Sequence, residues 1–287
     1  MWVLRTTLLL GAMTGLMLVV GLGLAYVAGL PFLPTLTAAF MLAMVMNLVM
    51  FFYADKWVLR MYRAKLVSEQ EQPTLHRIVS RLSERAGLPK PRVAVVPMDV
   101  PNAFATGRNP KNAVVAVTRG AMEVLKEEEL EGVIGHELAH VKNRDMLVST
   151  LAAIVAGAIS YLALVGRMQL FWGSGDRRSG GSTLLLLLAL ILVPLAALMI
   201  RLAVSRTREY GADEEGARIS GKPLALAGAL RRLEEYSRSE RMVHGNPSTS
   251  NLFIVNPFRG SSLLELFSTH PSTEKRIQRL EALAGRA

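Results

Sequence analysis

Residues 127–165 read EEELEGVIGHELAHVKNRDMLVSTLAAIVAGAISYLALV. The stretch begins with three glutamates, carries His136 and His140 four residues apart, and then becomes almost entirely apolar. In a helix, residues four apart lie on the same face, so both imidazoles would point in one direction. The apolar part is about as long as a helix that spans a bilayer. The stretch therefore predicts a polar helix with paired histidines that leads directly into a membrane helix.

The chain contains four apolar segments of this length, which predict four transmembrane helices. Hydrophobic residues make up 51% of the 287 residues, although the formal charge is +10, and the apolar residues are clustered. The first run is too long for a cleaved signal peptide and a second follows after a short turn, so we expect an uncleaved hairpin. The expected spans are residues 8–27, 32–53, 147–165 and 184–204.

Basic residues flank these spans unevenly. Lys56, Arg60, Arg63 and Lys65 follow the second span, whereas the turn between the first two has no lysine or arginine. The positive-inside rule therefore places both termini and the hydrophilic sequence in the cytoplasm. The positive charge suits anionic headgroups of the lipid bilayer, and no nucleic-acid motif accompanies it, so we expect no nucleic-acid partner. The absence of cysteine excludes disulfides and thiol catalysis.

The hydrophilic sequence forms two blocks, residues 66–146 and 205–287, each short for an independent domain. We expect them to combine into one domain that is interrupted by the hairpin 147–204 and preceded by the hairpin 1–65. The sequence pattern predicts helices in 73–86, from 122 past Asp145, and in 209–220 and 222–239, and a last helix within 268–285 that has Pro271 near its first turn. The β-branched runs 92–97 and 113–118, with a short strand between them, predict a small sheet. The fold class is a multi-pass α-helical membrane protein with a mainly α (α+β) cytoplasmic domain.

His136, Glu137 and His140 form the pattern H-E-x-x-H. Two imidazoles one helical turn apart can share a zinc ion, and the glutamate beside them can take a proton from a zinc-bound water. The alternative is a surface helix with solvated histidines.

A catalytic zinc site of this type needs one more protein ligand and an open position for water. Glu209 is the candidate, and Asp213 lies four residues later on the same helical face. One carboxylate would bind the metal and the other would accept the spare N–H of a ligand histidine. The alternative is a solvated acidic face, since Glu214 and Glu215 follow.

Two motifs carry a resemblance to a known family. The pattern H-E-L-A-H-x4-D at 136–145 is followed, beyond the second hairpin, by S-R-x-R-E-Y-x-A-D at 205–213. Together they resemble the HtpX family of membrane-bound zinc metalloproteases, which are relatives of the CAAX prenyl proteases. The likeness extends to residues 101–120 and 266–280 and to the four-span layout, so it covers essentially the whole chain.

The resemblance implies a zincin-like protease domain of the gluzincin type with one zinc ion per chain. It implies that His136, His140 and Glu209 are the metal ligands, that Glu137 is the general base, and that Asp213 supports a ligand histidine. It also implies that His270 stabilises the oxyanion, although capping of the helix beside Pro271 is an equal alternative. By the same resemblance, residues 113–118 would be the edge strand on which an extended substrate pairs.

The resemblance further implies an endopeptidase of the bacterial cytoplasmic (inner) membrane that cleaves misfolded or damaged membrane proteins at the cytoplasmic face. This activity would be part of protein quality control in the heat-shock and stress response. Its partners would be membrane proteins and unfolded protein substrates. The alternatives are a processing protease of narrow specificity and a non-proteolytic membrane scaffold with structural zinc. Residues 244–262 are expected to cover the cleft. His76 and His244 have no partner pattern and are expected to be packed or solvated.

Overall fold

The computed structural model describes residues 29–145, 206–239 and 271–285, together with Ile254 and several positions between 11 and 25. Over these residues the protein is mainly helical. Of the four expected spans, 32–53 lies inside this part of the chain and 8–27 lies mostly outside it. The expected spans 147–165 and 184–204 and the expected loop 244–262 lie outside the described residues, apart from Ile254.

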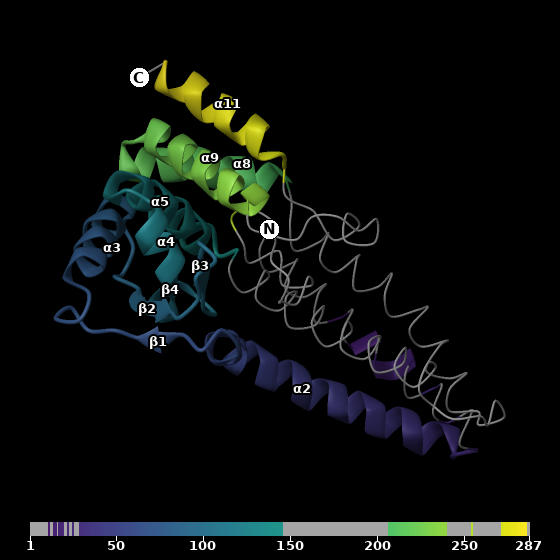
Figure 1. The fold of residues 1–287 in the computed structure, drawn as a ribbon. Helices are drawn as coiled ribbons and strands as arrows, with labels where there is room; N and C mark the ends of the chain where they lie inside the picture. Colours follow the sequence, from purple (N-terminus) through teal and green to yellow (C-terminus); the bar gives the residue numbers. More distant parts are fainter. Residues whose placement is uncertain are drawn as a thin grey trace.

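Helix α2 (Phe32–Met61) is long and apolar enough to cross a membrane, and among the described residues it is the one helix that meets this test. It begins directly after Pro31, and its 30 residues rise about 45 Å, which exceeds the hydrocarbon thickness of a bilayer. Figure 1 shows α2 projecting away from the other labelled elements. The C-terminal turns of α2 pack against the sheet, where Val58 is fully buried.

The sheet has four strands: β1 (Lys65–Leu66), β2 (Arg92–Val96), β3 (Ala103–Thr106) and β4 (Val114–Thr118). Its order is β1-β2-β4-β3, with β2 and β4 parallel and the other pairs antiparallel. Alternate residues of β4 face opposite sides. Val115 and Val117 join the helical core, whereas Val114 and Ala116 pack on the side where Val58 lies. Both faces of the sheet are therefore buried.

The expectation that residues 113–118 form the edge strand is wrong. β4 pairs with β2 on one side and with β3 on the other, so it has no free row of backbone groups on which a substrate could pair. Within the described part of the chain, β1 and β3 are the edges of the sheet.

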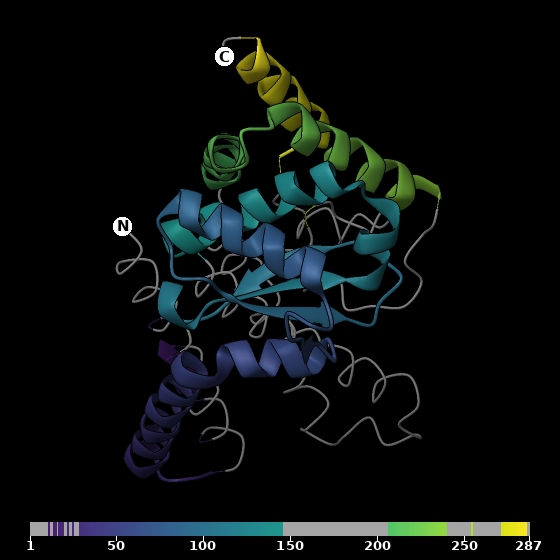
Figure 2. The same ribbon diagram turned by 90° about the vertical axis from the view of Figure 1, so that its left-hand side faces the viewer.

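The helices other than α2 form layers on the face of the sheet opposite to α2. Figure 2 shows, in order, α2, the sheet, α3 with α5, then α8 with α9, and finally α11. α5 lies at the centre, since it contacts α3, α8, α9 and strand β3. The bounds of the helices are α3 Pro73–Ala86, η1 Pro110–Asn112, α4 Arg119–Val124, α5 Glu127–Asn143, α8 Arg206–Ser220, α9 Pro223–Ser239 and α11 Thr273–Ala284.

The helix that carries H-E-x-x-H is shorter than its apolar pattern predicts. An extended pair, Leu125 and Lys126, separates α4 from α5, and the backbone N–H of Lys126 donates to Glu129 Oε2. At the other end Arg144 adopts a left-handed conformation with φ 59°. α5 therefore ends at Asn143 and does not continue past Asp145 as expected.

Two glycines allow α5 and α8 to touch along their backbones. A Cβ atom on Gly135 would lie 2.8 Å from the carbonyl oxygen of Gly216, and one on Gly216 would lie 2.7 Å from the Cα of His136. Only glycine permits so close an approach. This contact brings the first turn of α8 next to the histidines of α5.

Candidate metal centre

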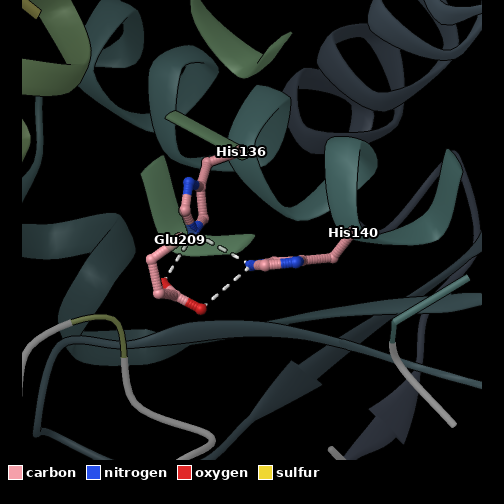
Figure 3. A group of neighbouring side chains, drawn as sticks. All are labelled: His136, His140 and Glu209. Atoms are coloured by element: carbon pink, nitrogen blue, oxygen red, sulfur yellow. Dashed lines mark hydrogen bonds and ion pairs between the residues drawn. The ribbon is translucent and has the colours of Figure 1, made fainter. Parts of the chain in front are cut away.

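Three side chains from α5 and α8 converge in the interior. The Nε2 atoms of His136 and His140 are 3.2 Å apart. Glu209 Oε2 lies 3.7 Å from His136 Nε2, and Glu209 Oε1 lies 3.6 Å from His140 Nε2. Figure 3 shows the three side chains pointing toward one another. The sequence-predicted ligand set is thus brought together from two helices that are far apart in the chain.

The spacing of these atoms fits a metal ion. Ligand atoms bound tetrahedrally to zinc at about 2.0 to 2.1 Å are about 3.3 Å from one another, close to the separations in this cluster. Two imidazole nitrogens and one carboxylate are ligands that suit zinc and leave a fourth position open.

The charges of the cluster also favour a cation. Burial opposes protonation of His140, but its contact with Asp145 and the negative charges of Glu209 and Glu137 outweigh burial and raise the pKa of His140 to about 9. The surrounding carboxylates therefore stabilise positive charge at this position.

Glu137 lies beside the cluster and is held against the sheet. The backbone N–H of Ala105, on edge strand β3, donates to Glu137 Oε2 at 2.8 Å. Burial raises the pKa of the Glu137 carboxyl, although the neighbouring histidines oppose this. The result is a carboxylate with increased basicity, in the position where a general base is expected.

His136 is oriented by an acid and an arginine. Its Nδ1 lies 2.9 Å from Asp213 Oδ1, so a proton on Nδ1 leaves Nε2 free to face the metal. Arg276, on α11, donates to both oxygens of Asp213 at 2.8 and 2.7 Å and to the carbonyl of Ile254 at 3.0 Å. Burial raises the pKa of Asp213, but Arg276 and His136 outweigh it and lower the value to about 2.

His140 has a similar but looser arrangement. Its Nδ1 lies 3.5 Å from Asp145 Oδ2, and Arg208 Nη1 lies 3.3 Å from Asp145 Oδ1. Burial raises the pKa of Asp145, whereas His140 and Arg208 lower it below the ordinary value. Each histidine thus faces an acid that is itself paired with an arginine.

The structure brings five of the six candidate residues into one site: His136, Glu137, His140, Glu209 and Asp213. The sixth, His270, lies outside the described residues, as does His244. His76 is packed on α3, where its Nε2 lies 2.9 Å from the carbonyl oxygen of Val67.

Sequence reasoning missed Arg276. It is 1% exposed and lies four residues before Leu280, which is fully buried on the same face of α11. An arginine within the apolar stripe of an amphipathic helix is the signal that could have identified it, because a buried guanidinium needs an acidic partner.

The chain is similar to known proteins over nearly its full length. The sequence profile of peptidase family M48 matches residues 69–284. The Protease HtpX homolog of Pyrococcus furiosus is 53% identical over 285 residues, covering 99% of this chain and 96% of that protein. The Protease HtpX homolog of Salinibacter ruber is 52% identical over 285 residues, covering 99% of this chain and 98% of that protein.

A solved structure has the same fold. The crystal structure of S. mikatae Ste24p matches with a TM-score of 0.51 at 18% identity and covers 97% of this chain. The match covers 65% of the Ste24p chain, so this protein spans just under two thirds of that length. At this level of identity the likeness concerns the fold alone.

Proposed function

The chain belongs to peptidase family M48 and is a metalloprotease, and on this basis we propose that it is a membrane-embedded zinc endopeptidase that cleaves misfolded or damaged membrane proteins at the cytoplasmic face of the bacterial inner membrane. The activity would serve protein quality control under heat shock and other stress. The observation that carries this proposal is the cluster of His136, His140 and Glu209 with Glu137 held beside it.

The residues of the site have distinct roles in this proposal. A zinc ion held by His136, His140 and Glu209 would supply polarisation of the peptide carbonyl and activation of a water. Glu137, whose pKa is raised by burial, accepts the proton of the attacking water and delivers it to the leaving amine. Asp213 and Arg276 orient His136 so that its Nε2 would be free to bind the ion, and His270 is proposed to stabilise the oxyanion.

Substrate pairing is proposed at β3 in place of β4. β3 is an edge of the sheet, and its Ala105 N–H already contacts Glu137. An extended substrate laid along this edge would bring its peptide bond close to the base.

The position of both ligand-bearing helices next to expected membrane spans supports the choice of substrates. α5 ends at Asn143, shortly before the expected span 147–165, and α8 begins at Arg206, directly after the expected span 184–204. Both ligand-bearing helices are thus adjacent in sequence to apolar spans. Loops and tails of membrane proteins would emerge where the proposed active site lies.

The ligand count favours a catalytic ion over a structural one. Structural zinc sites usually have four protein ligands, whereas the described residues offer three to this cluster. A structural zinc site also does not need a carboxylate of raised pKa, such as Glu137, beside the three ligands.

Proteolysis of an unfolded test protein by the purified, detergent-solubilised chain tests the proposal. We expect cleavage by the wild type, loss of cleavage on chelation, and recovery when zinc is restored. Glu137→Gln should lower the rate by at least about 10³-fold while zinc content stays at one per chain, because the ligands remain. A Glu137→Gln protein as active as the wild type would contradict the assigned base, and an inert wild type with full zinc would favour a narrow-specificity protease or a scaffold.

A further inference from the structure

A pocket lies where α2 meets the loop after β3, outside the metal centre. Its volume is about 360 Å³, and its lining comes from two parts of the chain. α2 contributes five residues, and the segment between β3 and η1 contributes one. The lining residues are Leu48, Val49, Phe52, Tyr53, Lys56 and Arg108.

The pocket combines an apolar floor with two cations. The ammonium of Lys56 lies 4.8 Å from the centre of the Tyr53 ring, and the guanidinium of Arg108 lies 5.2 Å from the centre of the Phe52 ring. These aromatic contacts hold the two charges in position but satisfy none of their N–H donors with an oxygen acceptor.

Neither cation has an acidic partner among the residues that the structure describes. Several other cations of the described residues do have one: Arg92 pairs with Asp55, Lys90 with Glu69, and Arg119 with Asp99. Both positive charges line the same pocket, so an anion bound there would be attracted by both.

The pocket lies at the depth expected for lipid headgroups. From Phe32 to Tyr53, α2 rises about 33 Å, close to the hydrocarbon thickness of a bilayer. Tyr53 and Lys56 would therefore lie at the interface, where tyrosine and lysine are common, and Leu48, five residues before Tyr53, would lie about 7.5 Å deeper, among the acyl chains. Arg108 reaches the same level from the protease domain.

We propose that this pocket binds an anionic phospholipid, with the phosphate between Lys56 and Arg108 and the upper acyl chain against Leu48, Val49 and Phe52. A free phosphate ester would leave the apolar floor unused, and a zwitterionic lipid would bring no net charge. The inference goes beyond the proposed function and rests on the membrane position of α2.

Such a lipid would connect the membrane surface to the active site. Arg108 follows β3 after a single glycine, Gly107, and β3 carries the N–H that contacts Glu137. A lipid that bridges Arg108 and α2 would hold this end of the edge strand at the bilayer surface.

Native mass spectrometry of the purified full chain in detergent tests the proposal, with added phosphatidylglycerol or phosphatidylcholine. We expect the wild type to retain one phosphatidylglycerol and to prefer it to phosphatidylcholine by at least about tenfold. Lys56→Gln/Arg108→Gln should lose this preference. The matched control, Arg60→Gln/Lys65→Gln, removes two exposed juxtamembrane charges outside the pocket and should keep it.

Several outcomes would overturn the proposal: no preference in the wild type, an unchanged preference in the pocket variant, an equal loss in the control, or full competition by glycerol 3-phosphate. Leu48→Gln keeps both cations and should also weaken phosphatidylglycerol binding, which keeps the test valid if the double variant fails to fold. No substrate is involved, so the result does not depend on the proposed proteolysis.

Discussion

At the scale of single residues, both metal-facing histidines have the same kind of support. His136 faces Asp213, which is held by Arg276, and His140 faces Asp145, which is held by Arg208. The first set is tighter, because Arg276 binds both oxygens of its acid and is almost fully buried. A planar guanidinium can fix a carboxylate in one orientation, and that carboxylate then fixes the imidazole.

We expect Arg276→Gln to weaken zinc binding by about 10- to 100-fold, because Asp213 would no longer be held in place. Arg276→Lys should weaken zinc binding almost as much as Arg276→Gln, since an ammonium cannot form the two parallel hydrogen bonds to Asp213. Chelator competition with the purified protein measures the affinity. Lys275→Gln, an exposed neighbour on the same helix, should bind zinc as the wild type does.

A double mutant separates positioning from general stability. If Arg276 acts through Asp213, adding Arg276→Gln to Asp213→Asn should change zinc affinity by less than about twofold. Additive losses would show that the arginine acts independently of this acid.

The ion pairs of the buried Glu131 should make the stability of the fold depend on pH. It is 4% exposed, and it pairs with Arg81 and with Lys222 Nζ, the latter at 3.1 Å. Burial raises the pKa of Glu131, but the two cations outweigh burial and lower it below 4.5. The folded-state pKa is thus below the unfolded one, so the pair stabilises the fold above about pH 4.5 and ceases to do so as the carboxyl is protonated at lower pH.

We therefore expect Glu131→Gln to lower the free energy of unfolding by about 1 to 2 kcal/mol at pH 7, and by less at pH 4. Thermal unfolding of the chelated proteins at both pH values measures this without a contribution from zinc. Glu127→Gln removes an exposed ion pair with Arg77 and should change stability by less than about 0.5 kcal/mol. A difference between Glu131→Gln and wild type that grows at pH 4 would contradict the direction of the shift.

At the scale of elements, the site depends on direct backbone contact between α5 and α8. Gly135 and Gly216 permit this contact, and it brings Glu209 within 3.7 Å of both metal-facing nitrogens. A methyl group between the helices would push α8 away and separate the carboxylate from the histidines.

Gly216→Ala should therefore lower both stability and zinc affinity. We expect a loss of about 1 to 3 kcal/mol from overpacking, together with at least tenfold weaker zinc binding. Gly211→Ala is the matched control on the same helix, because its Cβ atom meets nothing within 4 Å. That variant should be neutral or slightly more stable, since alanine favours helix. Equal effects of the two substitutions would rule out close packing as the cause.

At the scale of the whole molecule, sequence on both sides of the expected hairpin 147–204 packs into one core. α5 contacts α8 and α9, and buried residues of both blocks, such as Ile134 and Leu230, share a single apolar cluster. The C-terminal helix α11 completes this core with Leu280 and brings Arg276 to the metal centre.

The cysteine-free chain allows a direct test of orientation. We expect Leu30→Cys, in the turn before α2, to react with a membrane-impermeant maleimide in intact bacterial cells. Lys111→Cys, in η1 after β3, should react only after lysis, because the basic flanks predict that the protease domain is cytoplasmic. The reverse labelling pattern would contradict the proposed cytoplasmic orientation.

Local features of the chain were predictable because they depend on periodicity and composition. The strands at 92–96 and 114–118 and the helices at 73–86 and 223–239 lie where β-branched runs and amphipathic spacing indicate them. Helix boundaries were less predictable. The apolar pattern runs through Leu125 and beyond Asn143, whereas capping by Glu129 and the left-handed Arg144 define the actual ends of α5.

The order of residues along α5 was enough to put His136 and His140 on one face with Glu137 beside them, because residues four apart on a helix lie on the same side. The sequence by itself also determined that long apolar segments flank the hydrophilic blocks. Packing between distant segments was needed to bring Glu209 to these histidines, to put β3 rather than β4 at an edge of the described sheet, and to carry Arg276 from the far end of the chain to Asp213. Periodicity specifies which residues share a face, but which faces meet depends on packing between distant segments, here set by glycine contacts and strand order.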